Sequence, residues 1–224
     1  TIRRTGLKNK PWYGLMFDKL ETMCDGEVSQ FDNRYNTESI EEKYIENILG
    51  KTSAMFSIAC GSGAYEGKCK DSEVLAAERF AEKFGLLFQL RDDLLDFVST
   101  DDLAKKTIHN DFWCGYYTLP AIYSFSDCRN GAKLKQIAMD IKNGLYSELT
   151  DKRIAELIRV SDGFGYTLGM IDQYAEEAKQ SLNVFKDSIA RKKLQELVDT
   201  VHLSAHRIVS DHLSDIPFEK FVSI

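Results

Sequence analysis

Apolar residues recur along most of the chain at steps of three and four positions, the period of one buried face of an α-helix. The first such run predicts a helix from Tyr13 to about Phe31. Its expected buried face carries Leu15, Met16, Leu20, Met23, Val28 and Phe31. No segment alternates apolar and polar residues between turn signals, so the pattern predicts no β-sheet.

Capping signals set the start of the next two helices. Ser39 and Glu42 have the spacing of a capping box, in which two side chains satisfy backbone N–H groups at a helix start. A second helix is expected to begin there and to turn these residues inward: Ile40, Tyr44, Ile45, Ile48 and Leu49. It reaches the small residues 59–64, where close helix packing or termination is expected. Asp71 or Ser72 is expected to cap a third helix that runs to about Val98.

Proline marks the later boundaries. Only three prolines occur, and more than a hundred residues separate the first two, which favours long helices. Thr118 precedes Pro120, whose missing N–H costs nothing in a first helical turn, so a short helix is expected through Phe125. Further helices are expected at about 130–144, 150–160, 161–184 and 187–213. The chain is therefore predicted to form one all-α bundle.

Composition and charge narrow the function. With 43% hydrophobic residues, the 224-residue chain can bury a large core, and one domain is expected. Its net charge of -6 and pI near 5.3 argue against a general nucleic-acid or anionic-membrane binder, which needs a basic face. No segment has the length and apolarity of a membrane span, and the N-terminus lacks a signal peptide, so a cytoplasmic protein is expected. The five cysteines form no C-x-x-C pair and are expected to be reduced.

The sharpest local feature is Asp92-Asp93-x-x-Asp96 in the third predicted helix. Residues four apart lie on one helix face, so these carboxylates repel one another unless a cation lies between them. Neighbouring Leu90 and Leu94 predict partial burial, which makes unrelieved charge costlier. A hard, oxygen-preferring ion such as Mg²⁺ fits this set and leaves positions for phosphate oxygens. The alternative is an ordinary solvated acidic face.

Cations flank this segment in the sequence. Lys51 and Thr52 lie on the preceding predicted helix, where the ammonium group and the hydroxyl are suited to a diphosphate. Lys105 and Lys106 follow the acidic helix, ahead of Asp111. Each feature alone is weak, because loop lysines are usually solvated.

Several short motifs occur in one order: Gly26-Glu27-Val28-Ser29-Gln30, Lys51-Thr52, Phe88-Gln89, Asp92-Asp93-x-x-Asp96, Lys106-x4-Asp111 and Thr118-Leu119-Pro120. Together they resemble the trans-polyprenyl diphosphate synthase family. Gly169 to Ala178 resembles a late helix of that family, so the resemblance covers nearly the whole chain. It implies an isoprenoid-synthase-type bundle of long helices around a central cavity, formed by residues 1–224 as a single domain that lacks its N-terminal part.

The resemblance also implies roles for particular residues. Asp92, Asp93 and Asp96 look like the second of two aspartate-rich motifs and are expected to bind Mg²⁺. Substrate contacts are expected from Arg3, Arg4, Lys51, Thr52, Gln89 and Lys106, with Lys51, Asp92 and Lys106 taken as catalytic. The first aspartate-rich motif is expected just upstream of Arg3, and the span from Arg4 to Gly26 is shorter than in the family. Tyr116 stands where the family has a lysine.

The activity implied is condensation of an allylic diphosphate with isopentenyl diphosphate into a longer all-trans polyprenyl diphosphate. A homodimer or a heterodimer is expected. A non-catalytic scaffold or regulatory subunit of a heteromeric synthase is the main alternative, and a terpene cyclase is a weaker one. Finding D-D-x-x-D upstream of Arg3 in the gene would separate the first two.

Two other features have competing interpretations. His202 and His206 have the i,i+4 spacing of zinc ligands, with Asp199 and His212 nearby, but the absence of H-E-x-x-H favours a plain amphipathic helix. The aromatic residues could line an isoprenoid cavity or pack the core, and packing is favoured. They are Phe112, Trp113, Tyr116, Tyr117, Tyr123 and Phe125.

Overall fold

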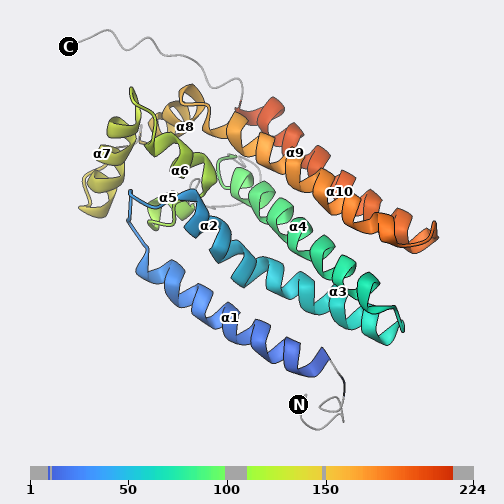
Figure 1. Ribbon diagram of the computed structural model, residues 1–224. Coiled ribbons are helices and arrows are strands. Elements are labelled where there is room, and N and C mark those ends of the chain that lie inside the picture. Colours follow the sequence, from blue (N-terminus) through green and yellow to red (C-terminus); the bar gives the residue numbers. More distant parts are fainter. Residues whose placement is uncertain (1–9, 11, 99–109, 148–149, 214–224) are drawn as a thin grey trace, which may run out of the picture. The chain divides into compact units, whose positions relative to one another are not determined.

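The computed structural model describes residues 10, 12–98, 110–147 and 150–213 (Figure 1). Every regular element within these ranges is helical, and none of them is a strand. The predicted all-α class is therefore confirmed. The described residues divide between two compact units. The first takes its described residues from the ranges 1–32, 42–89 and 170–202, and the second from 33–41, 90–169 and 203–224. The single domain expected from the sequence stays a prediction.

In the first unit, α1 (Trp12–Asp32) lies along the helical segment that follows it in the sequence (Figure 1). It contacts the π-helix η3 (Leu49–Ser53) and α3 (Ala54–Glu66). The bounds of α1 agree with the prediction, and Met16 is buried. Val28 and Phe31, however, are each 62% exposed. Their predicted burial is wrong, and so is that of Leu20, which is 38% exposed. In this part of α1 it is Gly26 and Gln30 that face η3 instead.

The second helix, α2 (Glu41–Ile48), starts two residues later than predicted. The Ser39 hydroxyl accepts a hydrogen bond from Asn33 Nδ2 at 2.9 Å, a turn contact made ahead of the helix. Ile40 therefore precedes the helix and is 59% exposed, which corrects its predicted inward position. Tyr44 and Ile48 are buried as predicted, and helical structure continues through η3 and α3.

The third predicted helix is α4 (Asp71–Leu95), which ends three residues earlier than expected. At its start the Lys70 N–H donates to Glu73 Oε2 at 2.8 Å, so the cap forms one residue before the predicted position. Gly85 lets α4 approach η3 closely, because a Cβ at Gly85 would lie only 2.4 Å from Ser53 Oγ and 2.6 Å from Ser53 Cα. This contact fixes the spacing between Thr52 and the following turn of α4.

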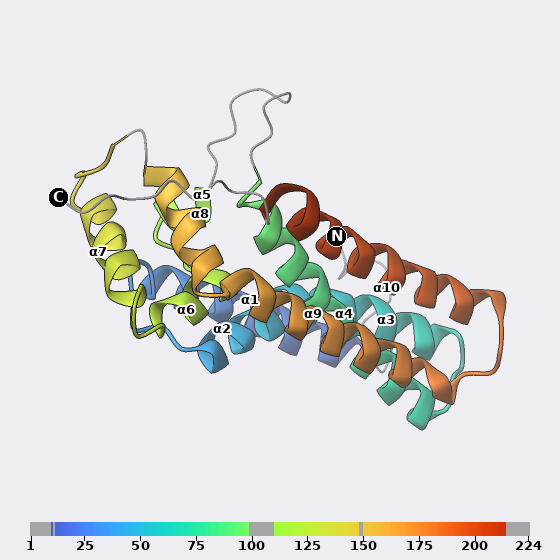
Figure 2. The same cartoon turned by 90° about the horizontal axis from the view of Figure 1, so that it is seen from above.

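The second unit contains four short helices, which the view in Figure 2 shows grouped together. They are α5 (Asn110–Trp113), α6 (Leu119–Phe125), α7 (Gly131–Lys142) and α8 (Thr150–Val160). The helix α6 contacts α7 and α8, and α5 contacts α7. Thr118 is the N-cap of α6 and Pro120 lies in its first turn, as predicted, whereas α5 was not predicted.

Aromatic packing holds this unit together. The rings of Phe112 and Tyr117 have centroids 5.0 Å apart, and those of Tyr117 and Phe125 are 4.9 Å apart. All three residues are less than 10% exposed. The packing interpretation is confirmed for these residues. Core contacts of this kind contribute more than area alone, because offset and edge-to-face ring pairs are favourable.

The last described elements are α9 (Gly163–Ser181), the 3₁₀ turn η4 (Leu182–Val184), α10 (Ile189–Ile208) and the π-helix η5 (Val209–Leu213). A Cβ at Gly163 would lie 2.3 Å from the Pro120 carbonyl oxygen, so the predicted helix junction requires glycine there. The five cysteines are free thiols, as expected. Among the helices of the described ranges, none has both the length and the apolarity of a bilayer-spanning segment.

Candidate active site

Three aspartates lie at the C-terminal end of α4. Asp92 and Asp93 occupy its last turn, and Asp96 follows one residue after the helix ends at Leu95. The Asp96 N–H donates to the Asp92 carbonyl oxygen at 3.3 Å. The helical turn therefore continues past Leu95, and the backbones of Asp92 and Asp96 lie one turn apart.

The core reaches this end of α4. Leu90 and Leu94 are completely buried, and Phe97 packs edge-on against Phe164 with ring centroids 5.3 Å apart. Asp93 itself is only 3% exposed. A charged carboxylate is rarely buried to this extent without a compensating partner. The burial of Asp93 therefore disagrees with the alternative interpretation of an ordinary solvated acidic face.

Two contacts orient the other carboxylates. Arg91 Nη1 donates to Asp92 Oδ1 at 2.8 Å, and Asp96 Oδ2 accepts a hydrogen bond from the Asp111 N–H at 3.2 Å. Burial raises the pKa of Asp92, and the charge of Arg91 offsets this only in part. A carboxylate whose ionised form is disfavoured even beside an arginine is the kind of group a divalent ion stabilises, because the ion replaces the proton.

The raised pKa of Asp92 has a consequence for stability. More protons bind the folded than the unfolded chain, so the contribution of Asp92 to stability is present below its ordinary pKa of 3.8 and decreases as the pH rises through the folded-state pKa. Asp92→Asn removes this ionisation. The Asp92 side chain is 40% exposed, so solvent screens much of this effect. We therefore expect the substitution to raise the Tm only slightly, by about 1 °C or less, at pH 7 without divalent ions, measured by circular dichroism.

Asp187→Asn is the matched control for this measurement. Asp187 pairs with Lys192 at 3.1 Å, and both side chains are more than 60% exposed, so the pair contributes little. The Tm of the Asp187→Asn variant should therefore equal that of the parent chain. If Asp92→Asn lowers the Tm instead, the ion pair with Arg91 outweighs the cost of burying the carboxylate.

The diphosphate-binding residues expected from the first unit lie on or against η3. Lys51 Nζ lies 2.9 Å from Glu27 Oε1 and 3.2 Å from Gln30 Oε1, and Thr52 Oγ1 donates to Gln89 Oε1 at 2.7 Å. The structure thus brings Thr52 and Gln89 together. Isolated π-helical turns are frequent at functional sites, and this one was not predicted.

Glu27 and Gln30, the partners of Lys51, belong to the motif Gly26–Gln30. No role for either side chain was predicted from the sequence. Both side chains of the Lys51–Glu27 pair are more than 40% exposed. Such pairs stabilise a fold by about 0–1 kcal/mol, so separating Lys51 from Glu27 costs little free energy.

Arg3, Arg4 and Lys106 are outside the described residues. Tyr116, which stands where the family has a lysine, lies under the guanidinium group of Arg34, with Arg34 Cζ 5.1 Å from the ring centroid. Arg34 Nε donates to the Cys114 carbonyl oxygen at 2.7 Å. The sequence did not single out Arg34, because it is 82 positions away along the chain (116 minus 34).

The all-α fold, with an aspartate-rich helix end that is partly buried, defines an isoprenoid-synthase-type protein. Residues 4–156 match the polyprenyl synthetase family, and the chain belongs to that family. The resemblance found in the sequence motifs is confirmed.

Named relatives and solved structures extend this assignment. The chain is 29% identical over 201 residues to decaprenyl-diphosphate synthase subunit 1 of Schizosaccharomyces pombe, a match covering 87% of this chain and 52% of the relative. It is 29% identical over 175 residues to heptaprenyl diphosphate synthase component 2 of Bacillus subtilis, a match covering 77% of this chain and 48% of the relative. A similar solved structure is the crystal structure of a polyprenyl synthase from Caulobacter crescentus CB15, complexed with calcium and isoprenyl diphosphate. The TM-score is 0.73 and the identity 29%, and the match covers 84% of this chain and 58% of that chain.

The matched residues cover only part of each relative. The chain spans about half the length of the curated relatives it matches.

Proposed function

We propose that the protein is a trans-polyprenyl diphosphate synthase, which joins an allylic diphosphate to isopentenyl diphosphate. Membership of the polyprenyl synthetase family carries this proposal. The aspartate cluster at the end of α4 supports it, because its residue types suit a diphosphate-bound metal ion.

Asp92, Asp93 and Asp96 are the proposed ligands of Mg²⁺. Carboxylate oxygens are the donors that this ion prefers, and the raised pKa of Asp92 fits a carboxylate whose ionised form an added cation would stabilise. Calcium accompanies isoprenyl diphosphate in the related Caulobacter structure, which supports a divalent ion. When bound, Mg²⁺ supplies positive charge that offsets the negative charge of the leaving diphosphate.

The chain's own residues are proposed to hold the allylic diphosphate. Lys51 contributes an ammonium group and the Gln89 amide contributes its NH2 donors. The Thr52 hydroxyl, which donates to Gln89 Oε1 in the structure, would have to turn from that oxygen to donate to the diphosphate. Arg3, Arg4 and Lys106 are proposed as further cationic contacts on the basis of the family resemblance. As the allylic C–O bond breaks, its electron pair goes to the diphosphate, where these donors stabilise the growing charge.

Carbon–carbon bond formation needs no nucleophile from the protein. The double bond of isopentenyl diphosphate attacks the allylic cation, and the released diphosphate accepts the proton that is then lost. The product is longer by one five-carbon unit. An apolar surrounding protects the cation from water, which is the proposed role of the central cavity that the family resemblance implies.

A partner chain is part of this proposal. The names of the two curated relatives, subunit 1 and component 2, describe members of assemblies with more than one component. We propose that this protein likewise acts as a homodimer or with a different chain. A non-catalytic subunit remains the alternative, and a cytoplasmic location stays a prediction.

Incubating the protein from the complete gene with Mg²⁺, farnesyl diphosphate and labelled isopentenyl diphosphate tests the proposal. We expect labelled products longer than farnesyl diphosphate by whole five-carbon units, identified by chromatography after phosphatase treatment. The same assay is run with allylic diphosphates of other lengths and with the co-purified partner chain. No elongation in any combination would reject catalysis, and activity only when a catalytic partner is present, unaffected by Asp92→Asn, would support the non-catalytic alternative.

A further inference from the structure

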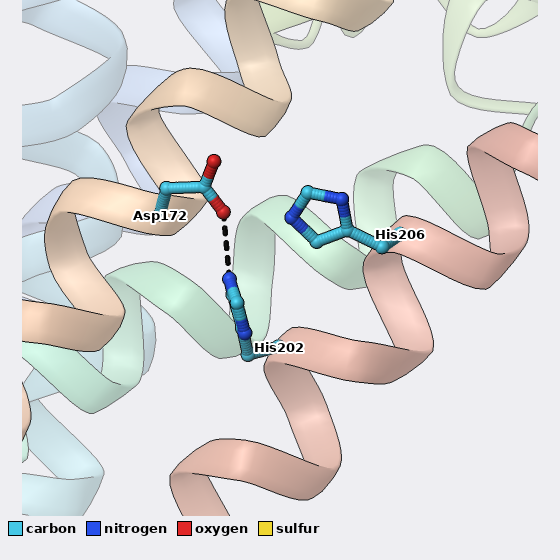
Figure 3. A group of neighbouring side chains, drawn as sticks. All are labelled: Asp172, His202 and His206. Carbon is cyan, nitrogen blue, oxygen red and sulfur yellow. Dashed lines mark hydrogen bonds and ion pairs between the residues drawn. The ribbon is translucent and has the colours of Figure 1, made fainter.

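A second group of metal-ligating side chains lies on α9 and α10, away from the aspartate cluster in the sequence. His202 and His206 are one helical turn apart on α10, and Asp172 is on α9 (Figure 3). His202 Nε2 and Asp172 Oδ1 share a hydrogen bond of 2.6 Å. The ligand atoms of the three residues all lie within 4.8 Å of one another.

Helix geometry accounts for half of this arrangement. Residues four apart on an α-helix lie above one another on the same face, so two histidines with this spacing offer their imidazoles to one point. Figure 3 shows both rings extending from α10 toward the Asp172 carboxylate. The third ligand therefore comes from a residue 30 positions earlier in the chain (202 minus 172), which sequence spacing could not reveal.

We propose that Asp172, His202 and His206 bind a divalent transition-metal ion of the zinc type. Two imidazoles and one carboxylate suit zinc, whereas magnesium prefers an all-oxygen set. Ligand atoms at a tetrahedral zinc lie about 3.3 Å from one another, given bonds of about 2.0–2.1 Å. The separations in the structure bracket this value, so modest side-chain rotations bring the three atoms to coordinating positions.

The site is open to solvent. Side-chain exposure is 27% for His202 and 52% for Asp172, so an ion has access and a water molecule completes the coordination. On binding, the ion takes the place of the hydrogen shared between His202 and Asp172. It joins α9 to α10 and is therefore expected to stabilise the folded chain increasingly as the ion concentration rises above its Kd.

Asp199, the carboxylate first considered beside these histidines, is not part of the site. It forms an ion pair with Lys179 of α9. Asp172 and Asp199 thus offer a matched pair of aspartates on neighbouring helices, of which only Asp172 reaches the histidines. The same Asp→Asn substitution at each position separates coordination from a general loss of negative charge.

Titration of the metal-free chain with Co²⁺ and then Zn²⁺ tests the proposal. We expect one equivalent of Co²⁺ to give the visible d–d absorption of a four-coordinate nitrogen–oxygen site, which Zn²⁺ then displaces. His202→Ala, His206→Ala and Asp172→Asn should each weaken binding by more than about tenfold, while Asp199→Asn binds as the parent does. Zn²⁺ should also raise the Tm of the parent and not that of the histidine variants.

A double variant, Asp92→Asn with Asp96→Asn, locates the ion independently of these substitutions. It should keep the Co²⁺ spectrum, whereas loss of the spectrum would place the ion at the aspartate cluster and overturn the proposal. Unchanged affinity in both histidine variants would overturn it as well. Circular dichroism of each variant establishes that it is folded. If an alanine variant does not fold, the near-isosteric Asp172→Asn variant still tests the site. The result does not depend on prenyl transfer.

Discussion

Asp92→Asn is expected to lower the rate of prenyl transfer by about a thousandfold. Asparagine keeps the size of the side chain but supplies no negative charge, so a magnesium ion bound to the aspartate cluster loses its first proposed ligand. The departing diphosphate then develops charge that is less well stabilised. Steady-state kcat with saturating substrates, measured over a series of Mg²⁺ concentrations, checks the expectation.

Measuring the Tm of the Asp92→Asn variant shows whether its lower rate of prenyl transfer results from unfolding. Because burial raises the pKa of Asp92, the asparagine variant should melt slightly higher than the parent while it loses activity. Asp187→Asn, which removes the same charge from an exposed ion pair, should retain full activity. An Asp92→Asn enzyme with more than a tenth of the parent rate at all Mg²⁺ concentrations would contradict a metal role for Asp92.

The fold was predictable where local signals and packing agree. Thr118 and Pro120 mark the start of α6 with a cap and a proline that is harmless in the first turn, and the structure has both. Phe31 shows the limit of such reasoning. A stripe of apolar residues predicts which helix face is apolar, but the neighbours in space decide whether that face is covered, and Phe31 remains 62% exposed.

The π-helix η3 illustrates a second limit. Its sequence, LGKTS, carries no periodic signal that distinguishes it from the α-helices on both sides. The residues around η3 that the sequence pattern does not reveal belong to α1 and to α4, through Ser53 beside Gly85 and Thr52 bonded to Gln89. The location of Lys51 and Thr52 on a helix was therefore predictable, but the kind of helix was not.

The grouping of acidic residues in the candidate site was predictable from the sequence. The spacing of Asp92 and Asp96 implied one helix face, and the hydrogen bond from the Asp96 N–H to the Asp92 carbonyl oxygen maintains that turn. The pairing partners were not predictable. Arg91 contacts Asp92 although adjacent residues on a helix point in different directions, and this contact depends on the long, flexible arginine side chain.

Gly85→Ala is expected to destabilise the chain by about 2 kcal/mol, which corresponds to a Tm lowered by about 4–8 °C. A Cβ at Gly85 would lie 2.4 Å from Ser53 Oγ and 2.6 Å from Ser53 Cα, so η3 and α4 must separate to admit it. Alanine favours a helix by about 1 kcal/mol over glycine, but the clash involves backbone and outweighs this gain. Urea unfolding of both chains measures the difference.

Gly63→Ala provides the matched control. Gly63 lies within α3, and a Cβ there has no neighbouring atom within 4 Å, so the same substitution should stabilise the chain by about 0.5–1 kcal/mol. Separation of η3 from α4 at Gly85 also pulls Thr52 from Gln89, one turn after Gly85, and breaks their 2.7 Å hydrogen bond. We therefore expect Gly85→Ala, unlike Gly63→Ala, to raise the KM for the allylic diphosphate. Equal stability changes in the two variants would mean that the approach of η3 to α4 is not tight.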